Sequence, residues 1–391
     1  MGALRITDGV YWVGVLNANL RWFDIVVPTE HGTTYNSYLI VDDKIALIDT
    51  VHADYTPLFL EKLASVVDVS KIDYVIGHHA EMDHSGSLAR ILELARNAEV
   101  VSSKAGVRYL QQVAHREFKA RVVGDGDELR LGNRTLRFLA APLWHWPETF
   151  FTFAVEDGIL FSCDGFASHY ADERMFDDQI GDFTADFRLY YDHIMRVNKS
   201  KIWQAVQKVE KLDVRIIAPS HGPILRQRAQ WAIQKYAEWS RPVEKSDKRV
   251  LIFYVAAYGN TARMAKAVAE GLREAGVNVS LYDAQGLDIV SLFDAIEAAD
   301  GLLFGSPTFN GDAVKPIWDV LYWLSFVEVK GKKGGAFGSY GWSGEATRLI
   351  EARLQDLKLS VPVPAVKATL VPTEEDLARC RQFGRDFAAQ L

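Results

Sequence analysis

The chain has 391 residues, 49% of them hydrophobic, and a formal net charge of −7. This length suits two domains with sizeable cores, and a negative charge without any basic run argues against a general nucleic-acid-binding protein. The chain has only two cysteines, Cys163 and Cys380, which excludes a disulfide framework. Because we find neither a signal peptide nor an apolar stretch of about 20 residues, we expect a cytoplasmic protein that does not span a membrane.

Short segments typical of antiparallel strands occur throughout the first 240 or so residues. Residues 9–15 and 135–139 are examples, and helical stretches lie between such segments. We therefore expect an α+β or sandwich-like domain in this part of the chain.

Residues 79–84 carry the strongest chemical signal. They follow an apolar run at 74–77 that we interpret as a buried strand, and they precede residues spaced like one face of a helix. Two imidazoles and two carboxylates without sulfur suit iron or manganese, and also a catalytic zinc, rather than a structural zinc or an iron–sulfur cluster. Four ligands within six residues can hardly all reach one ion, so we expect two ions to share this loop. The four candidate ligands are His79, Glu81, Asp83 and His84.

Three further candidate ligands, His145, Asp164 and His221, each follow a strand-like segment. Each is ambiguous alone, because a histidine flanked by tryptophans is more often a packed core residue, and an aspartate before glycine at a strand end is usually a turn former. Together they predict a metal site built from loops at one edge of a sheet.

Three other residues are candidates for supporting roles. His78 adjoins the motif, but on a strand its side chain would point away from that of His79, so we expect it to support the site structurally. His169 follows Asp164 on the same loop, and we expect it either to form a hydrogen bond near the site or to deliver protons. Tyr35 is expected either to line the pocket or to be a buried strand residue.

Residues 240–248 are polar and charged and contain a proline, which predicts a linker. We therefore divide the chain into domains at 1–247 and 248–391. After the linker, residues 250–255 form a continuous apolar run, as expected of a central parallel strand, and residues 299–305 and 333–338 repeat the pattern of a strand followed by a loop. Strands that alternate with helices predict a doubly wound α/β domain.

Three loops follow these strands, and the first opens a helix whose backbone N–H groups can bind phosphate. In this order they resemble the phosphate loop and the two ring-binding loops of flavodoxin, which implies FMN as a cofactor. The sequence departs from flavodoxin at Ala256 and Tyr258, where a hydroxyl contact to phosphate is lost; this costs about 1.5–3 kcal/mol at most and would weaken FMN binding without abolishing it. The candidate FMN-binding residues are Tyr258, Gly259, Asn260, Thr261, Pro307, Thr308, Phe309, Asn310, Gly311, Ser339, Tyr340, Gly341, Trp342 and Ser343.

The metal motif resembles the signature of the metallo-β-lactamase superfamily, His-x-His-x-Asp-His, except that Glu81 replaces the second histidine. Through this substitution and the segments at 32–40 and 145–147, the sequence resembles the flavodiiron proteins. The resemblance covers essentially the whole chain. The resemblance implies a lactamase-like αββα sandwich followed by a flavodoxin-like doubly wound parallel sheet. It also implies that His79, Glu81 and His145 hold one iron, that Asp83, His84 and His221 hold a second, and that Asp164 bridges them.

The resemblance implies an O2 and/or NO reductase, and electron counting supports it. Two irons and one FMN store four electrons, as many as the reduction of O2 to two waters requires, whereas coupling two NO to N2O requires two. One alternative is a lactamase-type zinc hydrolase with an accessory flavodoxin-like domain, in which a zinc-bound hydroxide attacks the substrate. The other is an electron-transfer or redox-sensing module with a degenerate metal site. Glu81 argues against the former and the full set of seven candidate ligands against the latter.

The expected partners follow from the same resemblance. No Cys-x-x-Cys pair for a fused rubredoxin is present, so electrons must come from outside, with a separate rubredoxin expected as donor and a reduced deazaflavin coenzyme as the alternative. The family implies a head-to-tail homodimer, or a dimer of such dimers, in which the flavin of one chain meets the iron of the other.

Overall fold

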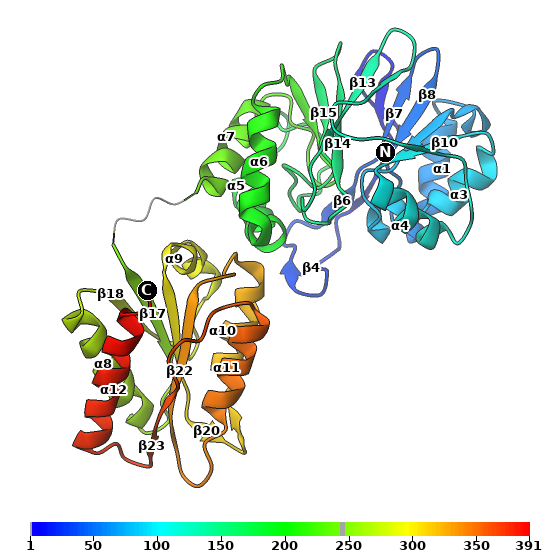
Figure 1. Ribbon diagram of the computed structural model, residues 1–391. Helices are drawn as coiled ribbons and strands as arrows, with labels where there is room; N and C mark the ends of the chain where they lie inside the picture. The colour runs from blue at the N-terminus through cyan, green and yellow to red at the C-terminus, as the bar shows by residue number, and fades with distance from the viewer. Residues whose placement is uncertain (1, 243–246) are drawn as a thin grey trace. The chain divides into compact units, whose positions relative to one another are not determined.

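The computed structural model describes residues 2–242 and 247–391, which fold as one compact unit within Met1–Pro242 and a second within Val243–Leu391 (Figure 1). The predicted linker at 240–248 falls partly outside the described residues, so the domain boundary after residue 247 stays a prediction. Among the described residues, no helix is both long and apolar enough to cross a membrane.

The first unit contains two large sheets. The first sheet has the order β1-β2-β7-β8-β9-β10-β11; its strands are antiparallel from β1 to β8 and parallel from β8 to β11. The strands are β1 (Leu4–Thr7), β2 (Val10–Trp12), β7 (Tyr38–Val41), β8 (Ile45–Ile48), β9 (Tyr74–Ile76), β10 (Glu99–Ser102) and β11 (Ala120–Val122).

The second sheet has the order β12-β13-β14-β15-β16 and is antiparallel except for its last pair. Its strands are β12 (Glu128–Arg130), β13 (Thr135–Ala140), β14 (Phe150–Ala154), β15 (Ile159–Phe161) and β16 (Ile216–Ala218). Small two-stranded sheets join β3 (Val15–Asn17) to β6 (Thr33–Tyr35) and β4 (Trp22–Phe23) to β5 (Val27–Pro28).

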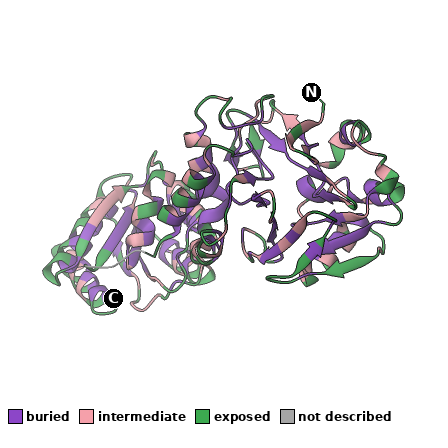
Figure 2. Ribbon diagram, turned by 90° about the horizontal axis from the view of Figure 1, so that it is seen from above, coloured by how far each residue is buried: buried purple, intermediate pink, exposed green. Residues whose placement is uncertain are grey.

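The two large sheets pack face to face because alternate strand residues are apolar on the facing surfaces. Trp12, Ile40 and Ile76 of the first sheet meet Phe138 and Phe161 of the second in one core cluster. A second cluster packs helices against the outer faces, and the buried strands lie between partly exposed helices (Figure 2). The helices are α1 (Thr56–Ala64), α3 (Leu88–Leu94) and α4 (Lys104–Ala114) over the first sheet, and α5 (Thr184–Tyr190), α6 (Lys199–Val209) and α7 (Ala229–Ser240) over the second.

The second unit is a parallel sheet of order β18-β17-β19-β22-β23 with helices on both faces. The strands are β17 (Arg249–Tyr254), β18 (Asn278–Asp283), β19 (Gly301–Gly305), β22 (Lys333–Tyr340) and β23 (Val366–Thr369). The helices α8 (Asn260–Glu274) and α12 (Glu374–Ala388) cover one face, and α9 (Phe293–Ala298), α10 (Lys315–Trp323) and α11 (Ala346–Asp356) cover the other.

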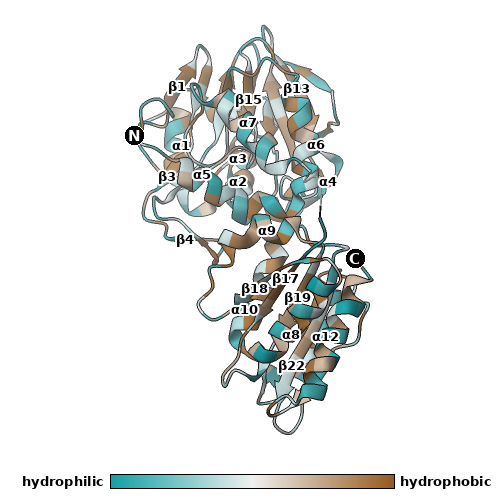
Figure 3. Ribbon diagram, turned by 90° about the vertical axis from the view of Figure 1, so that its left-hand side faces the viewer, coloured by the Kyte–Doolittle hydropathy of each residue, from teal (hydrophilic) through white to brown (hydrophobic). Residues whose placement is uncertain are grey.

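Figure 3 shows hydrophobic strands at the centre of this unit and hydrophilic outer helix surfaces. Strands buried on both faces explain the continuous apolar runs of the sequence. The predicted fold class, a lactamase-like sandwich followed by a doubly wound parallel sheet, is confirmed.

Candidate metal centre

The loop after β9 places the four clustered candidate ligands. The sequence predicted a loop between a strand and a helix, but Met82–Ser85 form one helical turn, α2, with Glu81 at its N-terminal cap. The backbone N–H and the hydroxyl of Thr50 both donate to the carbonyl oxygen of His84, at 2.7 and 2.8 Å. Because this turn is fixed from outside, Asp83 and His84 leave it in two defined directions.

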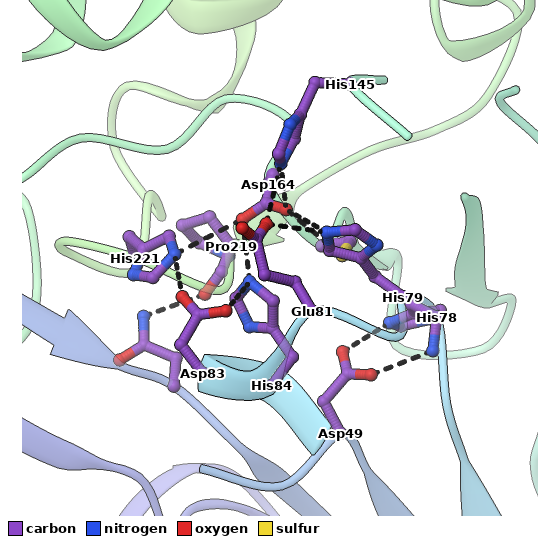
Figure 4. Close-up of polar contacts among 12 residues, drawn as sticks. Asp49, His78, His79, Glu81, Asp83, His84, His145, Asp164, Pro219 and His221 are labelled. Atoms are coloured by element: carbon purple, nitrogen blue, oxygen red, sulfur yellow. Dashed lines mark hydrogen bonds and ion pairs between the residues drawn. The ribbon is translucent and has the colours of Figure 1, made fainter. Parts of the chain in front are cut away.

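The structure brings His79, Glu81, His145 and Asp164 together in a first ligand group (Figure 4). One carboxylate oxygen of Glu81, Oε2, lies 3.0 Å from Nε2 of His79 and 3.3 Å from Nε2 of His145. Oδ2 of Asp164 lies 3.2 Å from the same atom of His145 and 3.6 Å from that of His79. Two imidazole nitrogens and two carboxylate oxygens therefore converge on one point.

Asp83, His84 and His221 form a second ligand group. Nε2 of His221 lies 3.1 Å from Oδ2 of Asp83, and Nε2 of His84 lies 3.4 Å from Oδ1 of Asp83. The other oxygen of Asp164, Oδ1, lies 3.1 Å from Nε2 of His84 and 3.3 Å from Nε2 of His221. Asp164 thus presents one oxygen to each group, which is the arrangement that a bridging carboxylate between two ions requires.

The second group also tests whether the residues fit metal ions. Both carboxylate oxygens of Asp83 and the Nε2 atoms of His84 and His221 are buried and form no well-aligned hydrogen bond among the described residues, although they lie 3.1–3.4 Å from one another. Buried polar atoms without partners are costly, and a divalent cation would satisfy all of them together. The mixed nitrogen and oxygen donor set suits iron, with Glu81 adding a hard oxygen donor.

The electrostatics of the two ligand groups point the same way. Burial disfavours charged imidazoles here, but the carboxylates beside them outweigh it and raise the pKa of His79 to about 10, of His145 to about 9 and of His221 to about 10. Although burial opposes it, the surrounding histidines hold the pKa of Asp164 well below its ordinary value. The two groups therefore favour positive charge at these positions, and a metal ion that binds there must displace the protons of the imidazoles.

Three contacts orient the ligands, and the sequence did not reveal them. Nδ1–H of His79 donates to Oε1 of the buried Glu148 at 2.9 Å; Nδ1–H of His221 donates to the carbonyl oxygen of Thr34 at 2.6 Å; and the hydroxyl of Tyr190 donates to Oδ1 of Asp164 at 3.1 Å. Bonds at Nδ1 leave Nε2 facing the centre. Glu148 could have been suspected, since it lies three residues after His145, whereas nothing in the sequence singled out Tyr190.

The segment at 32–40 acts through Asn36. Its amide donates to the carbonyl oxygens of Pro219 and Gly222, at 2.8 and 2.9 Å, on either side of His221. Nε1–H of Trp12 donates to the amide oxygen of Asn36 at 2.8 Å. This segment therefore holds the loop that carries one of the ligands.

His78 points away from the ligand groups, toward Asp49 (Figure 4). Its Nδ1–H donates to Oδ2 of Asp49 at 2.7 Å, and its Nε2 lies 2.7 Å from the hydroxyl of Thr152. Asp49 follows β8 in the first sheet and Thr152 lies on β14 in the second, so His78 connects the two sheets directly behind the metal motif. Cys163 completes this buried cluster.

The two residues expected to act in supporting roles lie near the second group. His169 is buried, with its ring centroid 5.3 Å from that of His221 and its Nδ1 2.9 Å from the hydroxyl of Thr33. Burial lowers its pKa well below the ordinary value, so its imidazole is neutral. Tyr35 lies on β6 with its ring 6.0 Å from that of His221, and burial raises its pKa to about 12.

A cavity of about 660 Å³ reaches the centre at Glu81 and Asp83. Its wall is mainly apolar, with Leu20, Trp22, Phe23, Val113 and Trp146 among the lining residues and Tyr35, His52 and Asp24 among the polar ones. Such a cavity admits a small uncharged molecule to the two ligand groups.

A pocket of about 310 Å³ lies at the ends of the strands of the second unit. Gly259, with φ of 80°, caps the 15-residue helix α8, whose first N–H groups face the loop. Trp342 and Tyr258 are 89% and 90% exposed, so they offer free flat surfaces to a ring system. The lining includes eleven of the predicted FMN-binding residues together with Ala257 and Leu370, but not Gly259, Gly311 or Ser343.

Comparison with known proteins adds independent findings. A family model described as ODP family beta lactamase matches residues 33–222, and a flavodoxin model matches residues 252–384. The chain is 40% identical to Flavo-diiron protein FprA2 of Clostridium acetobutylicum, over 100% of both chains, and 36% identical to a nitric oxide reductase of Moorella thermoacetica, over 99% of this chain and 98% of that one. Among solved structures, rubredoxin oxygen:oxidoreductase of Desulfovibrio gigas superimposes with a TM-score of 0.76 and 32% identity, covering 99% of this chain and 98% of that chain.

Proposed function

Because this chain belongs to the flavodiiron protein family, we propose that it reduces O2 to water and/or NO to N2O at a non-haem diiron centre supplied with electrons by FMN. The observation that carries the proposal is the position of Asp164, whose two oxygens each face a separate ligand group. A pocket with a helix N-terminus and two exposed aromatic rings, in a flavodoxin-like unit, supplies the second redox site. The chain is therefore an oxidoreductase.

We assign seven residues to the iron pair. His79, Glu81 and His145 would hold one iron; Asp83, His84 and His221 would hold the other; and Asp164 would bridge them. When bound, the iron pair supplies two electrons and open coordination positions for a diatomic molecule, and reduced FMN supplies two more electrons.

The chain's own residues prepare this chemistry. Glu148 and the carbonyl of Thr34 fix the imidazoles of His79 and His221 with Nε2 toward the centre. The apolar side chains of Trp22 and Trp146 line the cavity in front of the ligands and offer a small uncharged molecule a place to bind. Tyr35 shares this wall, and we propose that it limits the space beside the second group.

The contacts of His169 support a positioning role rather than proton delivery. Its imidazole is neutral and buried, and the hydroxyl of Thr33 lies 2.9 Å from Nδ1 of His169 and 3.4 Å from Nδ1 of His221. We propose that His169 and Thr33 together fix the ring of His221.

The lactamase-type zinc hydrolase is not favoured. Glu81 places a carboxylate where that signature has an imidazole, which stabilises a ferric ion. A flavodoxin unit in the same chain requires a redox partner, and zinc has no redox chemistry.

We further propose a separate rubredoxin as the electron donor, with a reduced deazaflavin coenzyme as the alternative, and a head-to-tail homodimer or a dimer of dimers. The name of the Desulfovibrio gigas relative supports the first choice. Both cysteines are buried and unpaired, which supports a reducing cytoplasm as the location.

The function is tested by reducing the purified protein anaerobically, adding O2 or NO in parallel, and measuring consumption together with the iron, zinc and FMN content. We expect about two irons and one FMN per chain and turnover of at least one gas. Stoichiometric zinc with hydrolase activity and no gas consumption would contradict the proposal.

A further inference from the structure

A short hairpin beside the metal centre carries an acidic residue with no assigned role. The strands β4 and β5 pair through Trp22 with Pro28 and Phe23 with Val27, and Asp24 follows Phe23 directly. Phe23 is buried, with its ring centroid 4.4 Å from that of His169 and 5.3 Å from that of His221. The hairpin is thus anchored on the second ligand group.

Asp24 lines the cavity that reaches the metal centre. Three carboxylates belong to the wall of this cavity within the described chain, and the other two, Glu81 and Asp83, are assigned as iron ligands. The backbone of Asp24 is left-handed, with φ of 46°, a conformation that aspartate and asparagine tolerate better than most residues. Its side chain also keeps contact with solvent.

The charged groups around Asp24 belong to both ligand groups. Partial burial in the cavity, followed by repulsion from Glu81 and Asp83, raises the pKa of Asp24 to about 6, while His145 and His221 act in the opposite direction. Burial is already the largest cause, and iron bound by Glu81 and Asp83 would offset the repulsion from these two carboxylates.

Two further polar side chains, one of them charged, lie on neighbouring segments and are directed elsewhere. The guanidinium of Arg21, on the hairpin itself, donates to the carbonyl oxygens of Ala18 and Leu20. His52, on another part of the wall, accepts from the backbone N–H of Asp54 and stacks on Tyr35. Asp24 is therefore a carboxyl group that reaches both solvent and the substrate cavity.

We propose that Asp24 passes protons from solvent to the substrate-derived oxygen atoms in the cavity. The inference rests on the proposed function, because that reaction consumes protons: four with four electrons for each O2 reduced to two waters, and two with two electrons for each pair of NO converted to N2O and one water. In each transfer the O–H bond of Asp24 breaks, an O–H bond forms on the substrate-derived oxygen, and the carboxylate takes a new proton from water at the cavity mouth.

The test compares Asp24→Asn with wild type, both loaded with iron and FMN. Asparagine keeps the shape and tolerates the left-handed backbone, but it cannot supply the proton. Fully reduced protein is mixed with O2 or NO in a stopped-flow instrument, so that no external donor is needed, and rates are measured from about pH 5.5 to 9. Glu30→Gln is the matched control. Glu30 is an exposed acidic residue close to the same hairpin, but it does not line the cavity.

We expect wild-type turnover to slow as the pH rises and Asp24 loses its proton. Asp24→Asn should consume gas about tenfold or more slowly, in line with the general contribution of a positioned acid, and its rate should lack this pH dependence. Iron content, FMN content and anaerobic reduction should not change, added formic or acetic acid should restore part of the rate, and Asp24→Glu should restore more. Glu30→Gln should match wild type.

Three outcomes would overturn the proposal. If Asp24→Asn reacts at the wild-type rate at every pH, Asp24 has no part in the reaction. If His52→Gln is slow while Asp24→Asn is not, His52 rather than Asp24 transfers the protons. Loss of iron from Asp24→Asn would instead make Asp24 a ligand. If wild type itself consumes neither gas, the proposed function fails, which is distinct from all three.

Discussion

Replacing Glu148 with alanine should destabilise the fold around the metal centre, because Glu148 holds His79 through a hydrogen bond. Oε1 of Glu148 accepts from Nδ1–H of His79 at 2.9 Å and from the backbone N–H of Ala80 at 3.1 Å, and the residue is 2% exposed. Glu148→Ala leaves both donors buried without a partner, at about 1–3 kcal/mol each. This is a large part of a typical unfolding free energy of about 5–15 kcal/mol.

The same change should weaken iron binding. Because Glu148 orients His79, its loss is expected to reduce affinity about 10- to 100-fold, the usual range for a residue that supports a ligand. Glu148→Gln keeps an acceptor oxygen for both donors, so it should lie much closer to wild type in the unfolding of the metal-free protein. Urea unfolding of the metal-free variants and the rate of iron loss to a chelator measure the two effects separately.

Glu128→Ala serves as the control. Glu128 forms an exposed ion pair with Arg137 at 2.9 Å, and such pairs contribute about 0–1 kcal/mol. If Glu148→Ala kept its iron as long as Glu128→Ala did, the hydrogen bond to His79 would not orient the ligand, and the reasoning would be wrong.

Four further predictions concern other parts of the molecule. His84→Asn should empty or destabilise one iron site and abolish turnover while FMN stays bound; wild-type turnover would refute the ligand assignment. Iron binding to the metal-free protein should release protons at pH 7, because the raised pKa values of His79, His145 and His221 keep these imidazoles protonated there. The affinity for iron should therefore rise with pH up to about pH 9–10, about tenfold per pH unit for each proton released. Calorimetry in buffers of different ionisation enthalpy counts the protons. The stabilisation that these raised pKa values give the metal-free protein is complete below about pH 6.5 and should disappear as the pH rises through 9–10, which urea unfolding at several pH values would show. Trp342→Ala should weaken FMN binding about tenfold or less without lowering Tm, because the residue is 89% exposed and contributes little to the core. An unchanged Kd in a fluorescence titration would contradict a stacking role.

The residues of the two candidate ligand groups could be singled out from the sequence because their side chains are types that bind metals. Four of the seven lie within six residues, and His145, Asp164 and His221 each follow a strand, where loops from neighbouring strands meet. The double-wound unit was predictable for a similar reason, since strands buried on both faces give unbroken apolar runs such as residues 250–255. In both cases the signal is local in the sequence.

The supporting contacts could not be predicted because they join residues far apart in the chain. Thr34 reaches His221 across 187 residues, and Glu148 reaches His79 across 69. Glutamate, threonine and tyrosine residues are common in the sequence. Only the packing of the two sheets decides which of these residues contact a candidate ligand. The helical turn at Met82–Ser85 was missed for the same reason, because contacts from Thr50 hold it and propensity does not.

These distant contacts explain why the centre lies at the rim of a sandwich. The motif follows a strand of the first sheet, whereas Asp164 and His221 follow strands of the second, so the seven candidate ligands converge only if the sheets keep their spacing. His78, one residue before the first ligand, joins Asp49 of the first sheet to Thr152 of the second through two contacts of 2.7 Å. The spacing is therefore fixed immediately behind the site. Because Asp164 must present one oxygen to each ligand group, a small shift between the sheets would separate the groups, and a direct link at His78 is the placement that best prevents it.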